Sequence, residues 1–274
     1  MEQLPSLKDT VTKYELLAKK ALGQNFLLDM NITDKIIRTS LEAQNKPDFS
    51  GEYVFEVGPG PGGLTRAILK AKPRQLTVIE MDSRCIQIMQ DIKSVVGEQL
   101  QIVEGDALKY EFKQDGIKNI VSNLPYNISV PLLMMWLKNI TDYSSLTLMF
   151  QKEVADRITA EPNSKIYGRI SVMAQLTCKI KVLFNLNPNC FVPAPKIWST
   201  VLLFQPLKEI PAPEILQKVE KLTEAAFGQR RKMLRQSLKN IPNLAEICAK
   251  ANVPLTARAE NLTPEQYLAL ALQL

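Results

Sequence analysis

Residues 56–65 have the sequence EVGPGPGGLT, and the short apolar segment 53–57 leads directly into them. A short apolar segment is typical of a strand that is buried on both faces of a sheet. Glycines after such a strand let the backbone approach a ligand closely, and the free N–H groups at the start of the next helix favour a negative or polar group. The stretch therefore predicts a strand, a ligand-binding turn and a helix over 64–70.

On both sides of this stretch, strand patterns and helix patterns alternate. Further short apolar segments predict strands, and apolar residues at helical spacing predict helices between them; the strands are 75–80, 101–103, 119–122 and 146–150, and the helices are 31–43, 83–93, 130–138 and 153–160. Such alternation predicts a parallel sheet with helices on both faces, as in Rossmann-like α/β proteins. The segments 171–183 and 199–205 are longer and richer in β-forming residues, which predicts antiparallel strands at the sheet edge.

A cluster of prolines, Pro206, Pro211 and Pro213, marks a boundary late in the chain. The pattern after it is helical to the end, with Ile215 and Val219 at helical spacing. We therefore expect two domains, a sheet domain over 1–205 and a small helical domain over 206–274. Residues 1–30 have the pattern of a polar helix.

The composition of the 274-residue chain is that of an ordinary globular protein with 34 Lys and Arg against 28 Asp and Glu, a net charge of +6. This charge suits a nucleic-acid partner without requiring one. The four cysteines form no C-x-x-C pair, so neither a metal site nor a disulfide framework is indicated, and a reducing, cytoplasmic compartment is expected. The longest apolar run has eight residues, far short of the roughly 20 that span a bilayer.

The chain contains no histidine. This absence removes the usual general base, the serine-histidine triad and the commonest metal ligand. Any chemistry must therefore use a carboxylate or proceed without strong proton abstraction.

Two acidic residues stand at the ends of the next two predicted strands. Glu80 lies 22 residues beyond Gly58, where an acidic side chain accepts hydrogen bonds from ribose hydroxyls. The glycines satisfy both G-x-G-x-x-G and G-x-G-x-G, so NAD and S-adenosylmethionine fit this pair of motifs about equally. Asp106, after the third strand, can accept a hydrogen bond from an adenine amino group, and this third contact favours the methyl donor.

Residues 123–129, NLPYNIS, come at the carboxyl end of the predicted strand 119–122. In an open α/β sheet, ligands bind at this end of the strands. Asn123 offers an amide, Leu124 a backbone carbonyl that Pro125 helps to orient, and Tyr126 a flat face. These groups are suited to hold a planar ring that bears an amine.

The stretch 228–239 carries five positive charges and no acid: Arg230, Arg231, Lys232, Arg235 and Lys239. On a continuous helix, Arg231, Arg235 and Lys239 share one face, while Phe227, Leu234 and Leu238 share another. One interpretation is a set of phosphate contacts to folded RNA. The other is an ordinary solvated helix face.

Taken together, five blocks resemble the ribosomal RNA adenine dimethyltransferases that modify the small ribosomal subunit. In family order, they are LGQNFL at 22–27, EVGPG at 56–60 with Gly62, EMD at 80–82, NLPYNIS at 123–129 and F-x-P-x-P-K at 191–196. Pro61 within the glycine loop, and Ala194 where the family often has proline, depart from the pattern. The resemblance implies a class I methyltransferase fold with a small C-terminal helical domain that contacts RNA.

The resemblance also implies the site residues. The S-adenosylmethionine site would comprise Leu22, Gln24, Asn25, Glu56, Gly58, Gly60, Gly62, Glu80, Met81, Asp106, Ala107 and Asn123. The target adenine would be held by Asn123, Leu124, Pro125, Tyr126 and Phe191. Two adjacent adenines of 16S-type RNA, each dimethylated during ribosome biogenesis, are the expected substrate, and the number of methyl groups rests on the resemblance alone. We expect a monomer with no metal and no membrane association.

Three alternatives to this expected activity stay open. The same chemistry on large-subunit RNA differs from it only in the target. A ribosome-assembly factor that acts mainly by binding would leave the intact constellation of site residues unused. A nicotinamide dehydrogenase would use the glycine loop and Glu80, but it has no proton relay without histidine and leaves 123–126 unexplained.

Overall fold

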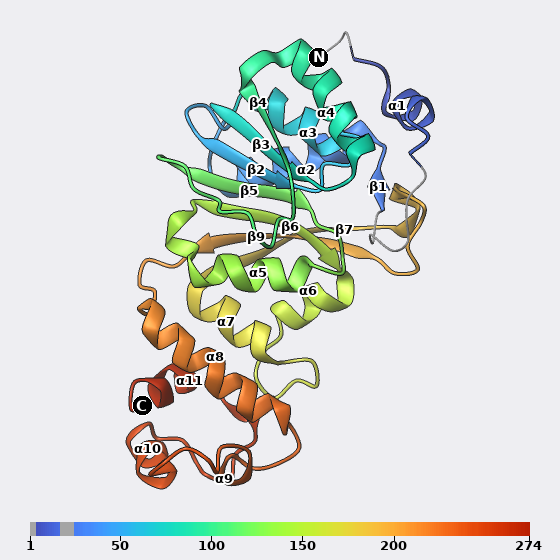
Figure 1. The fold of residues 1–274 in the computed structure, drawn as a ribbon. Helices are drawn as coiled ribbons and strands as arrows, with labels where there is room; N and C mark the ends of the chain where they lie inside the picture. Colours follow the sequence, from blue (N-terminus) through green and yellow to red (C-terminus); the bar gives the residue numbers. More distant parts are fainter. Residues whose placement is uncertain (1–3, 17–24) are drawn as a thin grey trace. The chain divides into compact units, whose positions relative to one another are not determined.

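The computed structural model describes residues 4–16 and 25–274, which form two compact units (Figure 1). The first unit lies within residues 1–133, 141–152 and 181–204, and the second comprises 134–140, 153–180 and 205–274. The two units therefore interleave along the chain. The predicted division at residues 205 and 206 stays a prediction, because the second unit also includes two segments from the middle of the sequence.

A seven-stranded sheet with strand order β4-β3-β2-β5-β6-β9-β7 forms the centre of the first unit. The strands are β2 (Tyr53–Val57), β3 (Gln75–Glu80), β4 (Leu100–Glu104), β5 (Lys118–Asn123), β6 (Ser145–Gln151), β7 (Cys178–Leu186) and β9 (Ser199–Pro206). Neighbouring strands from β4 to β6 pair in parallel, and β9 pairs antiparallel with β6. The predicted α/β sheet, mostly parallel with an antiparallel edge, is confirmed.

Seven α-helices precede or separate these strands along the described chain. They are α1 (Leu7–Lys13), α2 (Met30–Ala43), α3 (Gly63–Lys70), α4 (Ser83–Val96), α5 (Ser129–Lys138), α6 (Lys152–Ile158) and α7 (Arg169–Thr177). The predicted helices over 31–43, 64–70, 83–93, 130–138 and 153–160 are confirmed to within a few residues. The last segment carries α8 (Pro213–Gly228), α9 (Leu234–Ser237), α10 (Leu244–Lys250) and α11 (Pro264–Ala271).

The strand order places β2 between β3 and β5. The chain runs from β2 through β3 to the edge strand β4 and then returns to form β5 on the other side of β2. Ligands of open α/β sheets bind outside the carboxyl ends of the strands at such a reversal of strand order. The glycine loop after β2 and the NLPYNIS stretch after β5 therefore lie next to each other.

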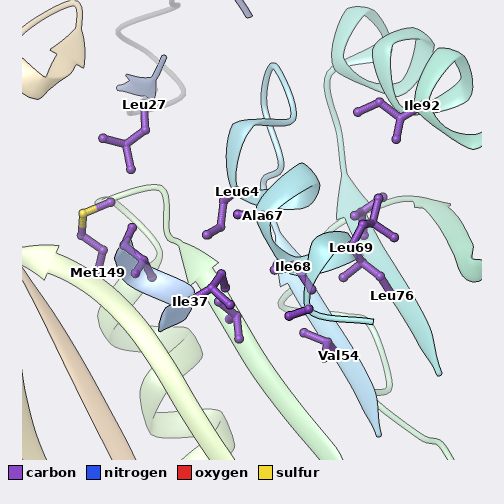
Figure 2. Close-up of a cluster of buried hydrophobic side chains, with 14 of the residues drawn as sticks. Leu27, Ile37, Val54, Leu64, Ala67, Ile68, Leu69, Leu76, Ile92 and Met149 are labelled. Atoms are coloured by element: carbon purple, nitrogen blue, oxygen red, sulfur yellow. The ribbon is translucent and has the colours of Figure 1, made fainter. Parts of the chain in front are cut away.

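Apolar side chains from the helices and the sheet fill one face of the first unit (Figure 2). Ile68 of α3 is fully buried, and it belongs to one cluster with Val54 and Leu76 of the sheet. Ile37 of α2 and Ile92 of α4 are buried in the same cluster. The helix-spaced apolar residues thus become the packed faces of these three helices.

A two-stranded antiparallel sheet joins the N-terminal segment to a late loop. Strand β1 (Phe26–Leu27) pairs with β8 (Phe191–Val192), and Leu27 lies opposite Phe191. Earlier in the chain, Arg66 of α3 donates a 2.6 Å hydrogen bond to the Pro5 carbonyl. Lys13 completes an ion pair of 2.8 Å with Asp91 of α4. These contacts hold the described N-terminal residues against the first unit.

Three aromatic rings pack together in the second unit. The ring of Phe227 lies 6.0 Å from that of Tyr167 and 5.9 Å from that of Tyr267, between centroids. Leu234 and Leu238 are also buried. Arg230 forms a 2.8 Å ion pair with Glu260 and donates a hydrogen bond to the Ser164 carbonyl. The second unit therefore has its own core.

Three predictions of secondary structure were wrong in part. The predicted strand over 171–183 is a strand only from Cys178 on, because Arg169–Thr177 form the helix α7. The pattern was misleading because nearly every residue of α7 is buried, so its apolar residues show no helical period. Residues 228–239 do not form one helix. Instead, α8 ends at Gly228, and the Leu234 N–H bonds to the Ala257 carbonyl. Within 1–30, α1 covers only 7–13, and residues 26–27 form β1.

Candidate active site

A cavity of about 330 Å³ opens at the carboxyl ends of β2, β3 and β5, within the first unit. Residues of the glycine loop, of the two acidic turns and of the NLPYNIS stretch line it together. The predicted site residues among its lining are Asn25, Glu56, Gly58, Gly60, Glu80, Met81, Asp106, Ala107, Asn123, Leu124, Pro125 and Tyr126. The predicted residues Leu22 and Gln24 lie outside the described residues.

The glycine loop needs its glycines for two physical reasons. Gly58, Gly60 and Gly62 have φ angles of +68°, +54° and +86°, which L side chains rarely adopt. A Cβ at Gly60 would also lie 2.9 Å from Cδ1 of Phe26. Gly62 is not among the cavity-lining residues. It caps α3, where a Cβ would lie 2.6 Å from Cδ1 of Ile92.

Glu80 ends β3 with its carboxylate held by backbone donors. Its Oε1 accepts hydrogen bonds from the N–H groups of Met81, at 2.7 Å, and Asp82, at 2.9 Å. Burial raises the pKa of Glu80, and these backbone hydrogen bonds oppose the rise. The carboxylate is thus oriented at the cavity wall, as recognition of ribose hydroxyls requires.

The turns after β3 and β4 add an apolar and a polar group to the cavity lining. Asp106 Oδ1 accepts a 2.9 Å hydrogen bond from the Leu108 N–H, which shapes the turn that follows β4. Met81 leaves 64% of its surface exposed, although it lines the cavity. An exposed thioether beside a carboxylate offers a flat aromatic base both an apolar face and a hydrogen-bond acceptor.

Glu56 is the most deeply buried carboxyl of the cavity, with 1% of its surface exposed. Thr65 donates a 2.7 Å hydrogen bond to Glu56 Oε2. Burial raises the pKa of Glu56 to about 8; the Thr65 hydrogen bond opposes this rise and the nearby Glu80 adds to it. The carboxyl is therefore mostly neutral at pH 7 in the ligand-free protein.

Asn123, the last residue of β5, has its amide group oriented by a single hydrogen bond. Its Nδ2 donates to the backbone carbonyl of Asn25 at 3.1 Å. A carbonyl can only accept, so it selects the amide orientation in which Nδ2 faces Asn25. No described residue donates a hydrogen bond to Oδ1, which leaves this oxygen as an acceptor at the cavity.

The residues after Asn123 form a rigid corner. Leu124 is buried at the cavity wall, and Pro125 packs against the loop so that a Cβ at Gly58 would lie 3.3 Å from its ring. The Tyr126 hydroxyl shares a 2.7 Å hydrogen bond with Ser199 Oγ of β9. Burial raises the pKa of Tyr126, so its ring stays an uncharged phenol.

Phe191 differs from the other predicted residues in its position. It is 3% exposed, belongs to the hydrophobic cluster of the first unit and is not among the cavity-lining residues. Its role as a wall for the target adenine stays a prediction. Sequence reasoning did not single out Phe26 and Leu27 of the cavity lining or Ser199 behind Tyr126. Phe26 and Leu27 are the last two residues of the LGQNFL block, so this motif could have identified them as site residues.

The five basic residues of 228–239 differ in their exposure and in their ion pairing. Arg230 is paired with Glu260, and only Arg231, Lys232, Arg235 and Lys239 are exposed. Over residues 4–16 and 25–274, no group of three or more His, Cys, Asp or Glu could hold a metal ion, and no helix is long and apolar enough to cross a membrane.

A family model described as "Ribosomal RNA adenine dimethylase" matches residues 16–274 of the chain. The chain belongs to this family. A Rhodospirillum rubrum protein named "Ribosomal RNA small subunit methyltransferase A" is 44% identical over 270 residues, which cover 98% of this chain and 92% of the relative. A Sinorhizobium medicae protein with the same name is 46% identical over 276 residues, 99% of this chain and 98% of the relative.

The fold matches those of solved methyltransferases. The crystal structure of a dimethyladenosine transferase from Plasmodium falciparum has a TM-score of 0.72 and 26% identity, covering 88% of this chain and 94% of that one. The predicted class I methyltransferase fold is confirmed. So is the enzyme class, an S-adenosylmethionine-dependent ribosomal RNA adenine methyltransferase, and with it the cofactor.

The cavity fits this cofactor. The glycine loop leaves room that a Cβ would fill, the Glu80 carboxylate is oriented at the wall, and Met81 is exposed beside Asp106. Glu80 would accept hydrogen bonds from ribose hydroxyls, while Met81, Asp106 and Ala107 would hold the adenine of the donor. When bound, S-adenosylmethionine supplies an electrophilic methyl group on its sulfonium.

Gly60→Ala tests the close approach of the loop to β1. The added Cβ meets Phe26 and forces a positive φ on alanine, which costs about 1–2 kcal/mol before the clash is counted. We expect affinity for S-adenosylmethionine, measured by calorimetry, to fall roughly tenfold or more. Gly51→Ala is the matched control, because Gly51 also has a positive φ but open space at its Cβ. Equal loss in both variants would contradict the account.

Glu56→Gln tests the neutral carboxyl. The unfolded carboxyl ionises above its ordinary pKa of 4.5, whereas the folded one keeps its proton up to about pH 8. The folded state therefore binds more protons in this window, and its free energy of unfolding falls as pH rises, by up to about 1.4 kcal/mol per pH unit. Glutamine removes this titration.

In urea unfolding of the ligand-free protein, we expect wild type and Glu56→Gln to be similarly stable near pH 5. The variant should become the more stable of the two as pH rises toward about 8. A stability difference that does not change with pH would show that Glu56 is already ionised in the folded protein.

Proposed function

We propose that this protein transfers methyl groups from S-adenosylmethionine to N6 of adenines in small-subunit ribosomal RNA during ribosome biogenesis, dimethylating two adjacent adenines. The names of the relatives support the small-subunit target. The observation that carries the proposal is the oriented Asn123 amide, whose Oδ1 is left as an acceptor at the wall of the cofactor cavity.

An adenine N6 amine is a poor nucleophile, because its lone pair is conjugated with the ring. In the proposed mechanism, Asn123 Oδ1 and the Leu124 carbonyl each accept one N6 hydrogen. The two acceptors draw the nitrogen toward tetrahedral geometry and direct its lone pair at the methyl group. Acceptors held in place before binding also stabilise the positive charge that develops on N6.

Positioning replaces proton abstraction in this mechanism. The chain has no histidine, and correct placement of the reacting groups can lower a barrier by up to roughly 7–11 kcal/mol. The N6 proton becomes acidic once the nitrogen carries the methyl group, so its release to water needs no strong base. Pro125 supports the placement, since its ring fixes the backbone that follows the Leu124 carbonyl.

Tyr126 supplies the flat surface for the target adenine. Its hydroxyl is held by Ser199, so the ring cannot turn away without breaking that hydrogen bond. Stacking of one base on an aromatic ring contributes about 1–3 kcal/mol. A second methylation requires that the monomethylated amine turn its methyl group away from the donor, after which only one N6 hydrogen is left for Asn123 and Leu124.

The RNA contacts outside the site involve the second unit. Arg231, Lys232, Arg235 and Lys239 are exposed and free of acidic neighbours within 228–239, so they are suited to phosphate contacts. Arg230 instead stabilises the second unit through Glu260. The protein acts as a monomer in the cytoplasm, where its reduced cysteines and its ribosomal substrate are found together.

Incubation with labelled S-adenosylmethionine and undermethylated small ribosomal subunits, followed by nucleoside analysis, tests this function. We expect the label in N6,N6-dimethyladenosine of the small-subunit RNA. Large subunits in a parallel reaction serve as the control. Label only in large-subunit RNA would show that the protein methylates that RNA instead. No label in either RNA would contradict a methyltransferase function and favour an assembly factor that acts by binding.

Asn123→Ala removes the oriented oxygen. We expect methyl transfer to fall by a hundredfold or more, roughly the loss from one preorganised hydrogen-bonding group. Affinity for S-adenosylmethionine should stay within about tenfold, because Glu80 and the glycine loop are unchanged. Asn123→Asp keeps an acceptor but loses the N–H donor to the Asn25 carbonyl, so its rate of methyl transfer should lie between those of wild type and Asn123→Ala. Equal losses of rate and donor affinity would mean that Asn123 acts mainly on the cofactor.

A further inference from the structure

Trp198 is the one tryptophan of the chain with a large exposed surface. The chain has two tryptophans, and Trp136 is 1% exposed whereas Trp198 is 47% exposed. An exposed indole keeps a large apolar surface in water and forgoes the stability that its burial would give. Trp198 does not line the cavity described above.

The position of Trp198 relates it to the adenine site. It directly precedes Ser199, whose hydroxyl holds the Tyr126 ring. Ser199 in turn pairs with Gln151 at the carboxyl end of β6, and Met149 of the same strand pairs with Asn123. Trp198 therefore lies beyond the same edge of the sheet as Asn123, two strand spacings across and three residues further along β9 than Val201, the residue level with Asn123, which is roughly 14 Å away.

Two exposed lysines lie near Trp198 in the backbone. The Trp198 carbonyl accepts a 2.8 Å hydrogen bond from the Lys152 N–H, which fixes its backbone. Lys152 and Lys196, the second of which precedes Trp198 by two residues, are both exposed. An exposed aromatic ring with exposed lysines near it suits a single-stranded nucleic acid, since bases stack on the ring and phosphates approach the charges.

We propose that Trp198 stacks on a nucleotide that flanks the target adenine in the RNA strand, and so positions that strand across the edge of the sheet. The proposal deepens the proposed function and rests on it for the identity of the RNA. Tyr126 holds the adenine that reacts, and Trp198 holds a base outside the reacting site. Trp198 is thus a positioning residue, which affects RNA binding and leaves the methyl donor untouched.

Steady-state methylation of undermethylated small subunits by wild type, Trp198→Ala and Trp198→Phe tests the proposal. We expect kcat/KM for subunits to fall roughly tenfold in Trp198→Ala, which corresponds to about 1.4 kcal/mol and to the loss of one stacked base. Trp198→Phe keeps a flat ring and should stay within about threefold of wild type. Affinity for S-adenosylmethionine and the melting temperature should be unchanged in both variants.

A fluorescence measurement gives a second readout that does not depend on activity. A short single-stranded RNA with two consecutive adenines, added at low salt, should quench the tryptophan emission of the wild type. Trp198→Phe retains only Trp136 and should show no quenching. If wild type methylates small subunits and Trp198→Ala does so equally well, the inference is wrong while the proposed function stands.

If wild type methylates no small subunit, the proposed function fails, and the fluorescence measurement then decides the inference on its own. Absence of quenching in wild type would overturn it. An equal loss of kcat/KM in Trp198→Phe and Trp198→Ala would also overturn it, because a flat ring would then not be what the RNA requires.

Discussion

The hydrogen bond from Asn123 Nδ2 to the Asn25 carbonyl is the interaction on which the arrangement of this site depends. It joins the end of β5 to the residue that leads into β1, and these are 98 positions apart in the chain. Asn25 is placed by the residues that follow it, because Phe26 packs on Gly60 and Leu27 pairs with Phe191. Correct orientation of one amide therefore requires the glycine loop and two distant strands to be in place.

This dependence follows from the chemistry. A chain without histidine that methylates a weakly nucleophilic amine relies on exact placement of the amine relative to its acceptors and the methyl group. Small displacements of these groups lower the rate strongly. Rigid parts accordingly surround the site, including three glycines at positive φ, Pro125 against Gly58, and Tyr126 held by Ser199. The neutral Glu56 beneath the cavity adds a buried group whose charge state changes near physiological pH.

Much of the fold and most of the cavity could be predicted from the sequence, since each depends on local patterns. Short apolar segments located the strands, and motifs at the strand ends converge because parallel strands end at one edge. Burial on all sides hid the helical period of α7, and backbone hydrogen bonds from Leu234 and Arg235 to 255–257 replaced the helix expected over 228–239. Phe191 belongs to a motif, but only the structure shows that its side chain is in the core.

A crystal structure of the protein with a non-reactive analogue of S-adenosylmethionine and a short RNA that contains the target adenines would test the central claim most directly. We expect N6 of one adenine to lie within hydrogen-bond distance of both Asn123 Oδ1 and the Leu124 carbonyl, with the Asn123–Asn25 hydrogen bond intact. An adenine bound with N6 away from both oxygens, or an Asn123 amide turned to donate to the base, would contradict it.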